Sequence, residues 1–473
     1  MRSLVWFRGK DLRVADHGPL TEAVASGELI PLFVLDPFFF DPIRARELPH
    51  RMQFLLDSLG SLEARLADLG SRLLVVPGRS VEVVPRLAAE WKVDRVLAHR
   101  WVEPLGRERD RRVGEALGRQ GVEFQLFEGE TLLPPGSVRT GQDRMFRVFT
   151  PFARAAGARL DLEPVRSVPS SLPPLPRDIA AMTVSIPSME DLGLTRNPAL
   201  QPGGEPHAHS RLQSFIKGPI TTYGADRDRM DLPGTSRLSA DLKFGTLSVS
   251  TVWRAAAGAG QGDSGRRYLT ELLWREFSHH LLWEWPELLQ QPFRPDFAGF
   301  PWQQDEGAWR AWTAGRTGYP VVDAAARQLL AEGFVHNRAR MVTASFLTKH
   351  LLLDYRLGEA HYLKWLTDGD WAQNSAGWQW SAGCGCDAQP WFRIFNPVTQ
   401  GLKFDPEGAY VKRWVPELAE CPTAFLHEPW RAPNSLRSRF DYPNPIVDHA
   451  FARQRFLATA RGHLGRTGAG NPV

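Results

Sequence analysis

The sequence predicts a mixed α/β chain in which an N-terminal doubly wound parallel sheet is joined by a long linker to an all-α domain. Over residues 1–130, short apolar runs alternate with segments of helical period, as strands alternate with helices in parallel sheets. Residues 131–202 are rich in proline and serine and show no sustained period, which indicates a surface linker. From residue 203 to about residue 450 the strand signals vanish and helical patterns continue.

The N-terminal part is expected to contain five strands. The apolar runs that predict them are 3–7, 29–35, 73–76, 93–98 and 124–129. Between them, helical periodicity predicts helices near 20–25, 50–70 and 80–91. Such a sheet binds ligands at the carboxyl ends of its strands, but no GxGxxG follows the first run, so a nicotinamide dinucleotide site is not supported.

The later part is expected to be helical throughout. Helices are predicted over 210–216, after residue 248, and over 268–285, 320–332 and 338–355. The basic tail, 451–473, ends in glycines and is expected to be a helix that frays, with no assigned function.

Chain length, cysteine count and net charge limit the classes of protein to which this chain can belong. A chain of 473 residues is too long for one ordinary core, so two or three domains are expected. Three cysteines make neither a disulfide framework nor a four-ligand zinc site, and no metal site is expected. The absence of a long apolar run or leader-like start predicts a soluble, cytoplasmic protein. With a net charge of only +4, an anionic partner must meet a local basic patch.

One stretch, residues 366–397, concentrates unusual chemistry. It contains Asp368, Asp370, Asn374, Trp371, Trp378, Trp380, Trp391 and Arg393. Amides, acids, glycines and indoles alternate here without a clean helical or strand period, which favours the floor of a pocket for a flat ligand with polar edges. The alternative is a tryptophan-rich helix and loop that is simply packed.

Two further segments carry polar groups with helical spacing. Residues 235–239, TSRLS, place hydroxyls at a helix start, which is either a phosphate cradle or a plain cap. Glu271, Trp274 and Arg275 share one helix face and could bind a planar heterocycle. The alternative for this face is an ion pair beside a core tryptophan.

A third segment begins after Gly333, a residue type that commonly ends a helix. Asn337 and Arg340 are three residues apart and share a face, whereas Arg338 points elsewhere. Two arginines aimed differently suit two anions, a bound cofactor and a polymer backbone. The alternative is a solvated helix face.

Seven motifs, in this order, carry a family resemblance over nearly the whole chain. They are VWFR, TSRLS, ELxWREF, GRTGYPVVDAAxRQL (Gly315 to Leu329), HNRxRM, DGDxAxNxxGWQWSAG and FRIFNP. The chain thereby resembles the photolyase and cryptochrome family. It is most similar to the bacterial class I cyclobutane pyrimidine dimer photolyases, because His336-Asn337 lacks the paired histidines of the (6-4) enzymes. The resemblance implies an antenna domain over 1–130, a linker over 131–202, an FAD-binding catalytic domain over 203–450, and a bound FAD bent into a U.

The resemblance also implies roles for single residues. The FAD phosphates and ribose are expected to contact Tyr223, Thr235, Ser236, Leu238 and Ser239. The flavin and adenine are expected to lie among Arg275, Asn337, Arg340, Asp368 and Asp370. Asn374 stands at the position that faces flavin N5, where plant-type cryptochromes have an aspartate. An amide there can hydrogen-bond a reduced flavin without adding negative charge.

The implied activity is light-driven repair of cyclobutane pyrimidine dimers in UV-damaged DNA, by electron transfer from excited reduced FAD to a flipped-out lesion. Trp274, Trp380 and Met341 are expected to wall the lesion, and Glu271 and Asn337 to hydrogen-bond its carbonyls. Arg227, Arg338 and Arg393 match arginines that contact the DNA backbone. The alternatives are a blue-light photoreceptor of the cryptochrome type and a generic electron-transfer flavoprotein. A monomer is expected.

The chain departs from the family in its electron relay. Trp378 and Trp302 match the inner and outer members of the usual tryptophan relay, but Tyr355 stands in the middle. Tyrosine is harder to oxidise and tends to lose its proton with the electron, so we expect either inefficient photoreduction or a detour through Trp371 or Trp365.

The antenna site also departs from the family. Residues 101–110 resemble the deazaflavin-binding branch, yet Trp101 stands where that branch tends to have an acid, and the loop 7–11 is one residue longer than usual. An 8-hydroxydeazaflavin is favoured over a folate, a second flavin or an empty pocket.

Overall fold

The computed structural model describes residues 1–162, 165–179, 183–259 and 262–465. Contacts within the chain divide it into two compact units. Unit 1 comprises Met1–Gly224 and Ser236–Pro286, and unit 2 comprises Ala225–Thr235 and Glu287–Val473. This division cuts the chain at positions other than the predicted domain limits, which stay a prediction.

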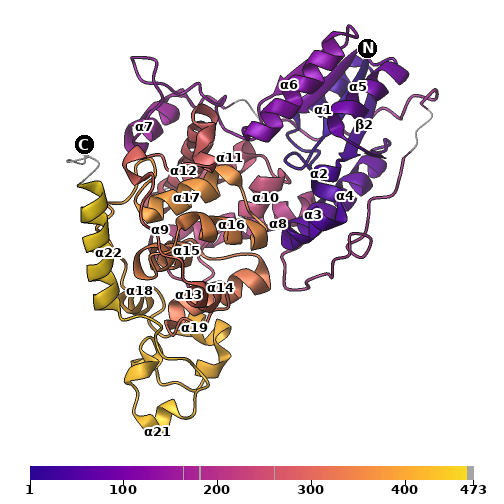
Figure 1. Cartoon of the computed structure of the whole chain (residues 1–473). Helices are drawn as coiled ribbons and strands as arrows, with labels where there is room; N and C mark the ends of the chain where they lie inside the picture. Colours follow the sequence, from indigo (N-terminus) through magenta and orange to yellow (C-terminus); the bar gives the residue numbers. More distant parts are fainter. Residues whose placement is uncertain (163–164, 180–182, 260–261, 466–473) are drawn as a thin grey trace. The chain divides into compact units, whose positions relative to one another are not determined.

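Unit 1 contains the expected parallel sheet (Figure 1). Its strands are β1 (Arg2–Phe7), β2 (Glu28–Leu35), β3 (Leu74–Pro77), β4 (Arg95–His99) and β5 (Glu123–Phe127). The strand order is β3-β2-β1-β4-β5, and every pairing is parallel. The chain therefore winds outward from β1 in both directions, as predicted from the alternating runs.

Side chains on the two faces of the sheet enter separate cores, because successive strand residues point to opposite sides. Val5 and Phe7 pack with α1 (Gly18–Ser26) and α4 (Pro49–Asp68). Leu4 and Trp6 pack on the other face with α5 (Ser80–Glu90) and α6 (Pro104–Gly118). Burial on both faces explains why the strands have continuous apolar sequences.

The remaining helices of unit 1 include several that the sequence did not predict. They are α2 (Pro37–Phe40), α3 (Pro42–Arg46), α7 (Phe149–Arg159), α8 (Glu205–Lys217), α9 (Tyr223–Asp226, which runs into unit 2), α10 (Ser239–Phe244), α11 (Val249–Ala259) and α12 (Asp263–Glu284). Helix α7 lies inside the expected linker. It is held by Phe152, which is fully buried and packs on Phe277 of α12 with ring centroids 5.0 Å apart.

The described residues of unit 2 contain helices and no strands. Their α-helices are α13 (Glu306–Thr313), α14 (Pro320–Glu332), α15 (Asn337–Ser345), α16 (Tyr355–Trp365), α17 (Trp371–Ala382), α18 (Pro397–Phe404), α19 (Ala409–Trp414), α20 (Thr423–Leu426), α21 (Asn434–Arg437) and α22 (His449–Leu464). Gly333 ends α14 in the left-handed conformation, as its position in the sequence predicted.

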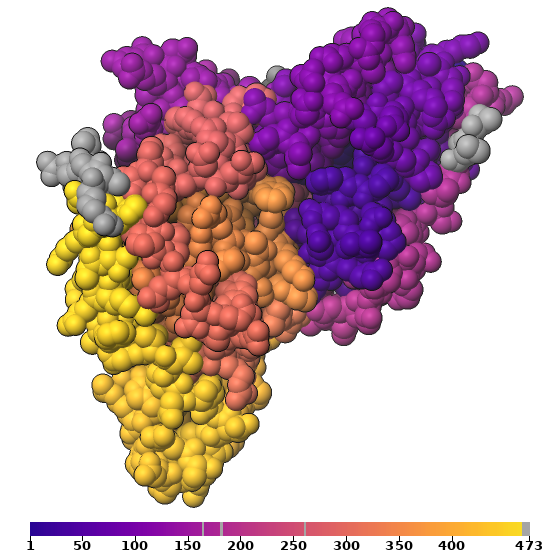
Figure 2. Space-filling model, in the orientation of Figure 1, coloured from indigo at the N-terminus to yellow at the C-terminus, as the bar shows by residue number. Residues whose placement is uncertain are grey.

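The end of the chain is helical as far as it is described. Helix α22 covers most of the expected tail, and residues 466–473 lie outside the described residues. Its Phe456 and Ala460 are fully buried in the core of unit 2, so this helix is part of the folded unit. The segment from α18 onward forms a continuous yellow surface in Figure 2. In the part of the chain described, no helix is both long enough and apolar enough to span a bilayer.

Candidate functional site

Helix α17 holds the amide of Asn374 in a defined orientation. Asp370 caps the helix by accepting a hydrogen bond from the Gln373 backbone N–H at 3.0 Å. One turn further on, the Asn374 side-chain NH₂ donates to the Glu359 carbonyl of α16 at 3.0 Å. Because a carbonyl can only accept, Nδ2 must face Glu359, and Oδ1 of Asn374 is presented as an acceptor on its other side.

An ion pair ties α15 to the segment before α17. The Arg340 guanidinium donates to Asp368 Oδ2 at 2.8 Å and, through Nε, to the Val335 carbonyl at 2.7 Å. Asp368 is only 8% exposed, and its Oδ1 is buried without a hydrogen-bond partner among the described residues. Buried carboxylate oxygens are normally satisfied, so Oδ1 could accept a hydrogen bond from a ligand or from water.

Helix α15 presents Asn337 and Met341 one turn apart on the same face. The Asn337 NH₂ lies 3.9 Å from the Met341 sulfur, and Asn337 is exposed. His336 caps the helix, since its Nδ1 accepts from the Arg338 N–H at 3.1 Å. Burial lowers the pKa of His336 to about 4, which keeps the ring neutral and able to accept.

Two of the three predicted DNA-contacting arginines gather around one acid. Arg338 pairs with Asp228 at 2.8 Å and lies over the Phe404 ring at 4.3 Å, and Arg227 approaches Asp228 at 3.9 Å. Asp228 was not predicted from the sequence, although the alternating charges of residues 226–231 are a visible signal. Arg393 is exposed on the segment after α17.

In unit 1, helix α12 carries Glu271, Trp274 and Arg275, the three residues that were expected to share a face. Trp274 stacks on Phe149 of α7 with ring centroids 3.6 Å apart and planes within 8°. Arg275 is buried and donates to the Glu130 carbonyl at 2.6 Å, while its Nε has no hydrogen-bond partner in the described residues. Trp274 is therefore backed by a parallel ring that the sequence did not reveal.

The segment before α10 is organised by hydroxyl groups. Ser236 Oγ accepts from the Tyr268 hydroxyl at 3.1 Å and from the Leu238 N–H at 3.4 Å. Leu238 is buried, Ser239 begins α10, and Tyr223 packs edge-on against Tyr268 with centroids 5.2 Å apart. The Ser236 hydroxyl thus serves the local turn, and its phosphate contact stays a prediction. In unit 2, Thr235 is half-buried.

Two tryptophans near the end of α17 differ in burial. Trp378 is 4% exposed, whereas Trp380 is half-buried. The tip of the Trp378 ring lies against Gly358 of α16, where a Cβ would come within 2.2 Å of it. Tyr355 begins α16 one turn earlier and is also buried.

Comparisons with known proteins match both parts of this chain. A family model described as DNA photolyase matches residues 3–174, and one described as the FAD binding domain of DNA photolyase matches residues 268–462. A deoxyribodipyrimidine photo-lyase of Thermus thermophilus is 41% identical over 459 residues, which cover 97% of this chain and 98% of the relative. The chain belongs to the DNA photolyase family.

Solved structures of the family are similar over the whole chain. A class III photolyase from Agrobacterium tumefaciens superposes with a TM-score of 0.91 at 36% identity, covering 98% of this chain and 97% of its own. A Synechocystis cryptochrome gives 0.87 at 30% identity, covering 96% and 99%. An archaeal photolyase from Sulfolobus tokodaii with two FAD molecules gives 0.84 at 29% identity, covering 98% and 100%.

In this photolyase-family chain, Trp101 is enclosed by cations of its own unit. Arg109 lies 4.3 Å from its ring centroid, Lys10 5.3 Å and Arg8 5.5 Å. Arg8 is fixed by Asp110 at 2.7 Å, and Trp101 is 6% exposed. The indole Nε1 is buried without a hydrogen-bond partner in the described residues. The indole faces are thus largely covered by the protein itself.

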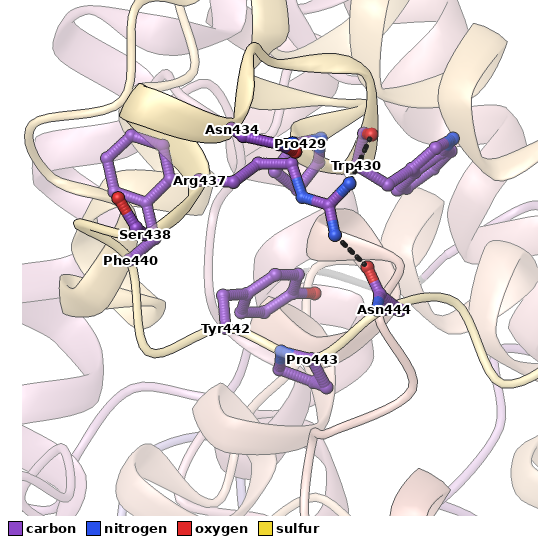
Figure 3. Close-up of a pocket in the computed structure, with 9 residues that line it drawn as sticks. All are labelled: Pro429, Trp430, Asn434, Arg437, Ser438, Phe440, Tyr442, Pro443 and Asn444. Atoms are coloured by element: carbon purple, nitrogen blue, oxygen red, sulfur yellow. Dashed lines mark hydrogen bonds between the residues drawn. The ribbon is translucent and has the colours of Figure 1, made fainter.

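A hollow of about 330 Å³ lies near the C-terminal end of this photolyase-family chain, between Pro429 and Asn444 (Figure 3). Arg437 crosses it and donates to the Trp430 carbonyl at 3.5 Å and to Asn444 Oδ1 at 3.2 Å. The Tyr442 hydroxyl donates to Asp323. None of the residues predicted for the functional site lines this hollow.

Proposed function

We propose that the chain is a deoxyribodipyrimidine photo-lyase, an enzyme that uses light to split cyclobutane pyrimidine dimers in UV-damaged DNA. The observation that carries the proposal is similarity over almost the whole length to proteins of that name, including 97% of this chain against the Thermus relative. The class I subtype stays a prediction, since one similar solved structure is a class III enzyme.

FAD is the cofactor of this proposal. Its binding residues in unit 2 are Thr235, Asn337, Arg340, Asp368, Asp370 and Asn374, and in unit 1 they are Tyr223, Ser236, Leu238, Ser239 and Arg275. The unpartnered Asp368 Oδ1 and Arg275 Nε support the assignment, because each is a buried polar atom that lacks a partner among the described residues.

When FAD is bound, reduced and excited by blue light, it would supply the electron that opens the cyclobutane ring and would take that electron back. Asn374 favours the reduced state, because its Oδ1 accepts and reduced flavin carries an N–H at N5. The Glu359 carbonyl keeps the amide in this orientation at 3.0 Å. A neutral amide adds no negative charge beside the flavin.

The lesion is flipped out of the duplex and enclosed, at a cost that is lowest for damaged bases. Trp274, Trp380 and Met341 form its apolar walls, and Phe149 stiffens Trp274 by stacking at 3.6 Å. The Asn337 NH₂, which Met341 holds only weakly at 3.9 Å, donates to a pyrimidine carbonyl, and Glu271 is the second polar group proposed for the lesion. Fixed dipoles of this kind stabilise the radical anion most where water is excluded.

DNA outside the lesion is bound through its phosphates by Arg227, Arg338 and Arg393. Asp228 supports this role, since it holds Arg338 at 2.8 Å and orients it before DNA arrives. Phosphate contacts give affinity that falls with salt and does not depend on sequence.

The proposal also includes a second, light-harvesting chromophore. A related archaeal photolyase is described with two FAD molecules, which are said to imply a novel light-harvesting cofactor. The preference for 8-hydroxydeazaflavin over folate, a second flavin or no antenna stays a prediction. The cations around Trp101 argue against a chromophore stacked on this indole, because the chromophore would have to displace Arg109 and Lys10. Reconstitution of the wild type and of Trp101→Ala with each chromophore, read by absorbance, tests which one binds.

One experiment tests the repair activity. Purified protein is reduced, mixed with UV-irradiated oligo(dT) and illuminated with blue light, and recovery of thymine absorbance is followed against a dark control. Thymine absorbance is expected to recover in the illuminated sample and not in the dark control. FAD-loaded protein that restores no absorbance would instead support the cryptochrome alternative. The monomeric state and the cytoplasmic location stay predictions.

A further inference from the structure

A row of aromatic rings leads from Trp378 along a path different from the one predicted. Trp312 of α13 meets Trp378 edge-on with ring centroids 6.1 Å apart, and Trp309 stacks on Trp312 at 5.5 Å with planes within 21°. Tyr362 of α16 lies beside both inner rings, 5.2 Å from Trp378 and 6.0 Å from Trp312. The row runs from fully buried Trp312 to half-buried Trp309 within unit 2.

The predicted middle member, Tyr355, is poorly placed to carry an electron. Among the described residues its ring makes no contact with another aromatic ring, and the ring contact of Trp302 is with Phe300 at 4.3 Å. Burial, together with Cys384 and Glu359, raises the pKa of Tyr355, so its hydroxyl does not readily release a proton. Trp371, one of the two detours expected from the sequence, likewise makes no ring contact in the described part of the chain.

The surroundings of the row suit oxidised tryptophans. The Trp312 Nε1–H donates to the Thr343 carbonyl at 3.3 Å, which keeps its proton in place while an electron passes. His361 packs edge-on near both outer indoles, at 5.7 Å from Trp309 and 5.6 Å from Trp312. Burial lowers the pKa of His361 to about 4, so the ring is neutral at pH 7 and adds no positive charge beside them.

We propose that the flavin is photoreduced through Trp378, Trp312 and Trp309 rather than through Tyr355 and Trp302. This inference rests on the proposed function. An electron passes from Trp378 to the bound flavin, from Trp312 to oxidised Trp378, and from Trp309 to oxidised Trp312. Half-buried Trp309 then gives its Nε1 proton to water. A thiol in solution returns one electron and one proton to Trp309, and two oxidised thiols pair as a disulfide.

The test compares Trp312→Phe and Trp309→Phe with the matched variants Tyr355→Phe and Trp302→Phe. Each is loaded with oxidised FAD and illuminated with a thiol present, while flavin reduction and the transient absorption of the tryptophan radical are recorded. The first two variants are expected to photoreduce slower by roughly tenfold or more and to lose the long-lived radical, while the second two stay within about twofold of wild type.

The opposite ranking, with Tyr355→Phe slow and Trp309→Phe unchanged, would overturn the route. Trp312 is 1% exposed, so Trp312→Phe could slow photoreduction by disturbing the fold. Trp309 is half-buried, so Trp309→Phe tests the same route with less effect on the core. Repair by chemically reduced wild-type protein is measured alongside. Its absence would refute the proposed function, while its presence with unchanged photoreduction in all four variants would refute this route alone.

Discussion

Replacing Glu359 by glutamine should stabilise the protein more at pH 8 than at pH 5. Glu359 lies on α16 and is 8% exposed. Burial, the largest cause, raises the pKa of its carboxyl from 4.5 to about 7, although a hydrogen bond with Ser375 opposes the shift. Between pH 4.5 and about pH 7, the carboxyl therefore keeps its proton in the folded protein but has lost it in the unfolded chain.

The size of the effect follows from that shift. Below pH 4.5 the carboxyl is protonated in both states and costs nothing. As the pH rises from 4.5 towards 7, only the folded state binds the proton, so stability falls with pH. A pKa raised from 4.5 to about 7 corresponds to about 3 kcal/mol lost by pH 8, at 1.36 kcal/mol per unit. Glutamine is neutral at every pH and avoids the loss.

Thermal unfolding of the wild type and Glu359→Gln at pH 5 and pH 8 measures the difference. For a chain of 473 residues, an unfolding entropy of about 2.1 cal/mol/K per residue converts about 3 kcal/mol into a Tm increase of roughly 3 °C at pH 8. Glu417→Gln is the matched control. Burial would raise the pKa of the Glu417 carboxyl, but its pair with Arg327 at 2.6 Å outweighs burial and lowers that pKa, so this change should destabilise the protein at pH 8. A Tm difference for Glu359→Gln that is the same at both pH values would refute the reasoning.

Three further predictions concern binding. Arg338→Gln should make the plot of log affinity for damaged DNA against log salt less steep by about 1, as measured by fluorescence anisotropy. The control Arg310→Gln, which removes an exposed ion pair with Glu306 within one helix, should leave this slope unchanged. Asp368→Ala should weaken FAD binding by roughly tenfold or more, read as flavin absorbance per protein, whereas Asp354→Ala should retain FAD. Phe149→Ala should weaken binding of dimer-containing DNA by about 0.5–1.5 kcal/mol without loss of FAD, and equal loss for undamaged DNA would contradict a role behind Trp274.

Local patterns were enough to predict most of the architecture. Apolar runs alternating with helical periods predicted the five parallel strands, because burial on both faces leaves a direct record in the sequence. Gly333 ended α14 as expected, since a left-handed residue is a local requirement. Helix α7 escaped prediction because its stability depends on Phe152 packing against Phe277, a contact that lies far along the chain.

The sequence by itself determined the family and the residue types available for a flavin, a lesion and DNA, because the motifs are contiguous strings. Only the tertiary structure showed which of these groups are already engaged: Trp274 on Phe149, Arg338 on Asp228, and Trp101 among cations. It also showed that the rings touching Trp378 include Trp312 and not Tyr355. Each of these pairs joins residues brought together by packing, which no pattern along the chain records, whereas strands, caps and motifs are set by near neighbours.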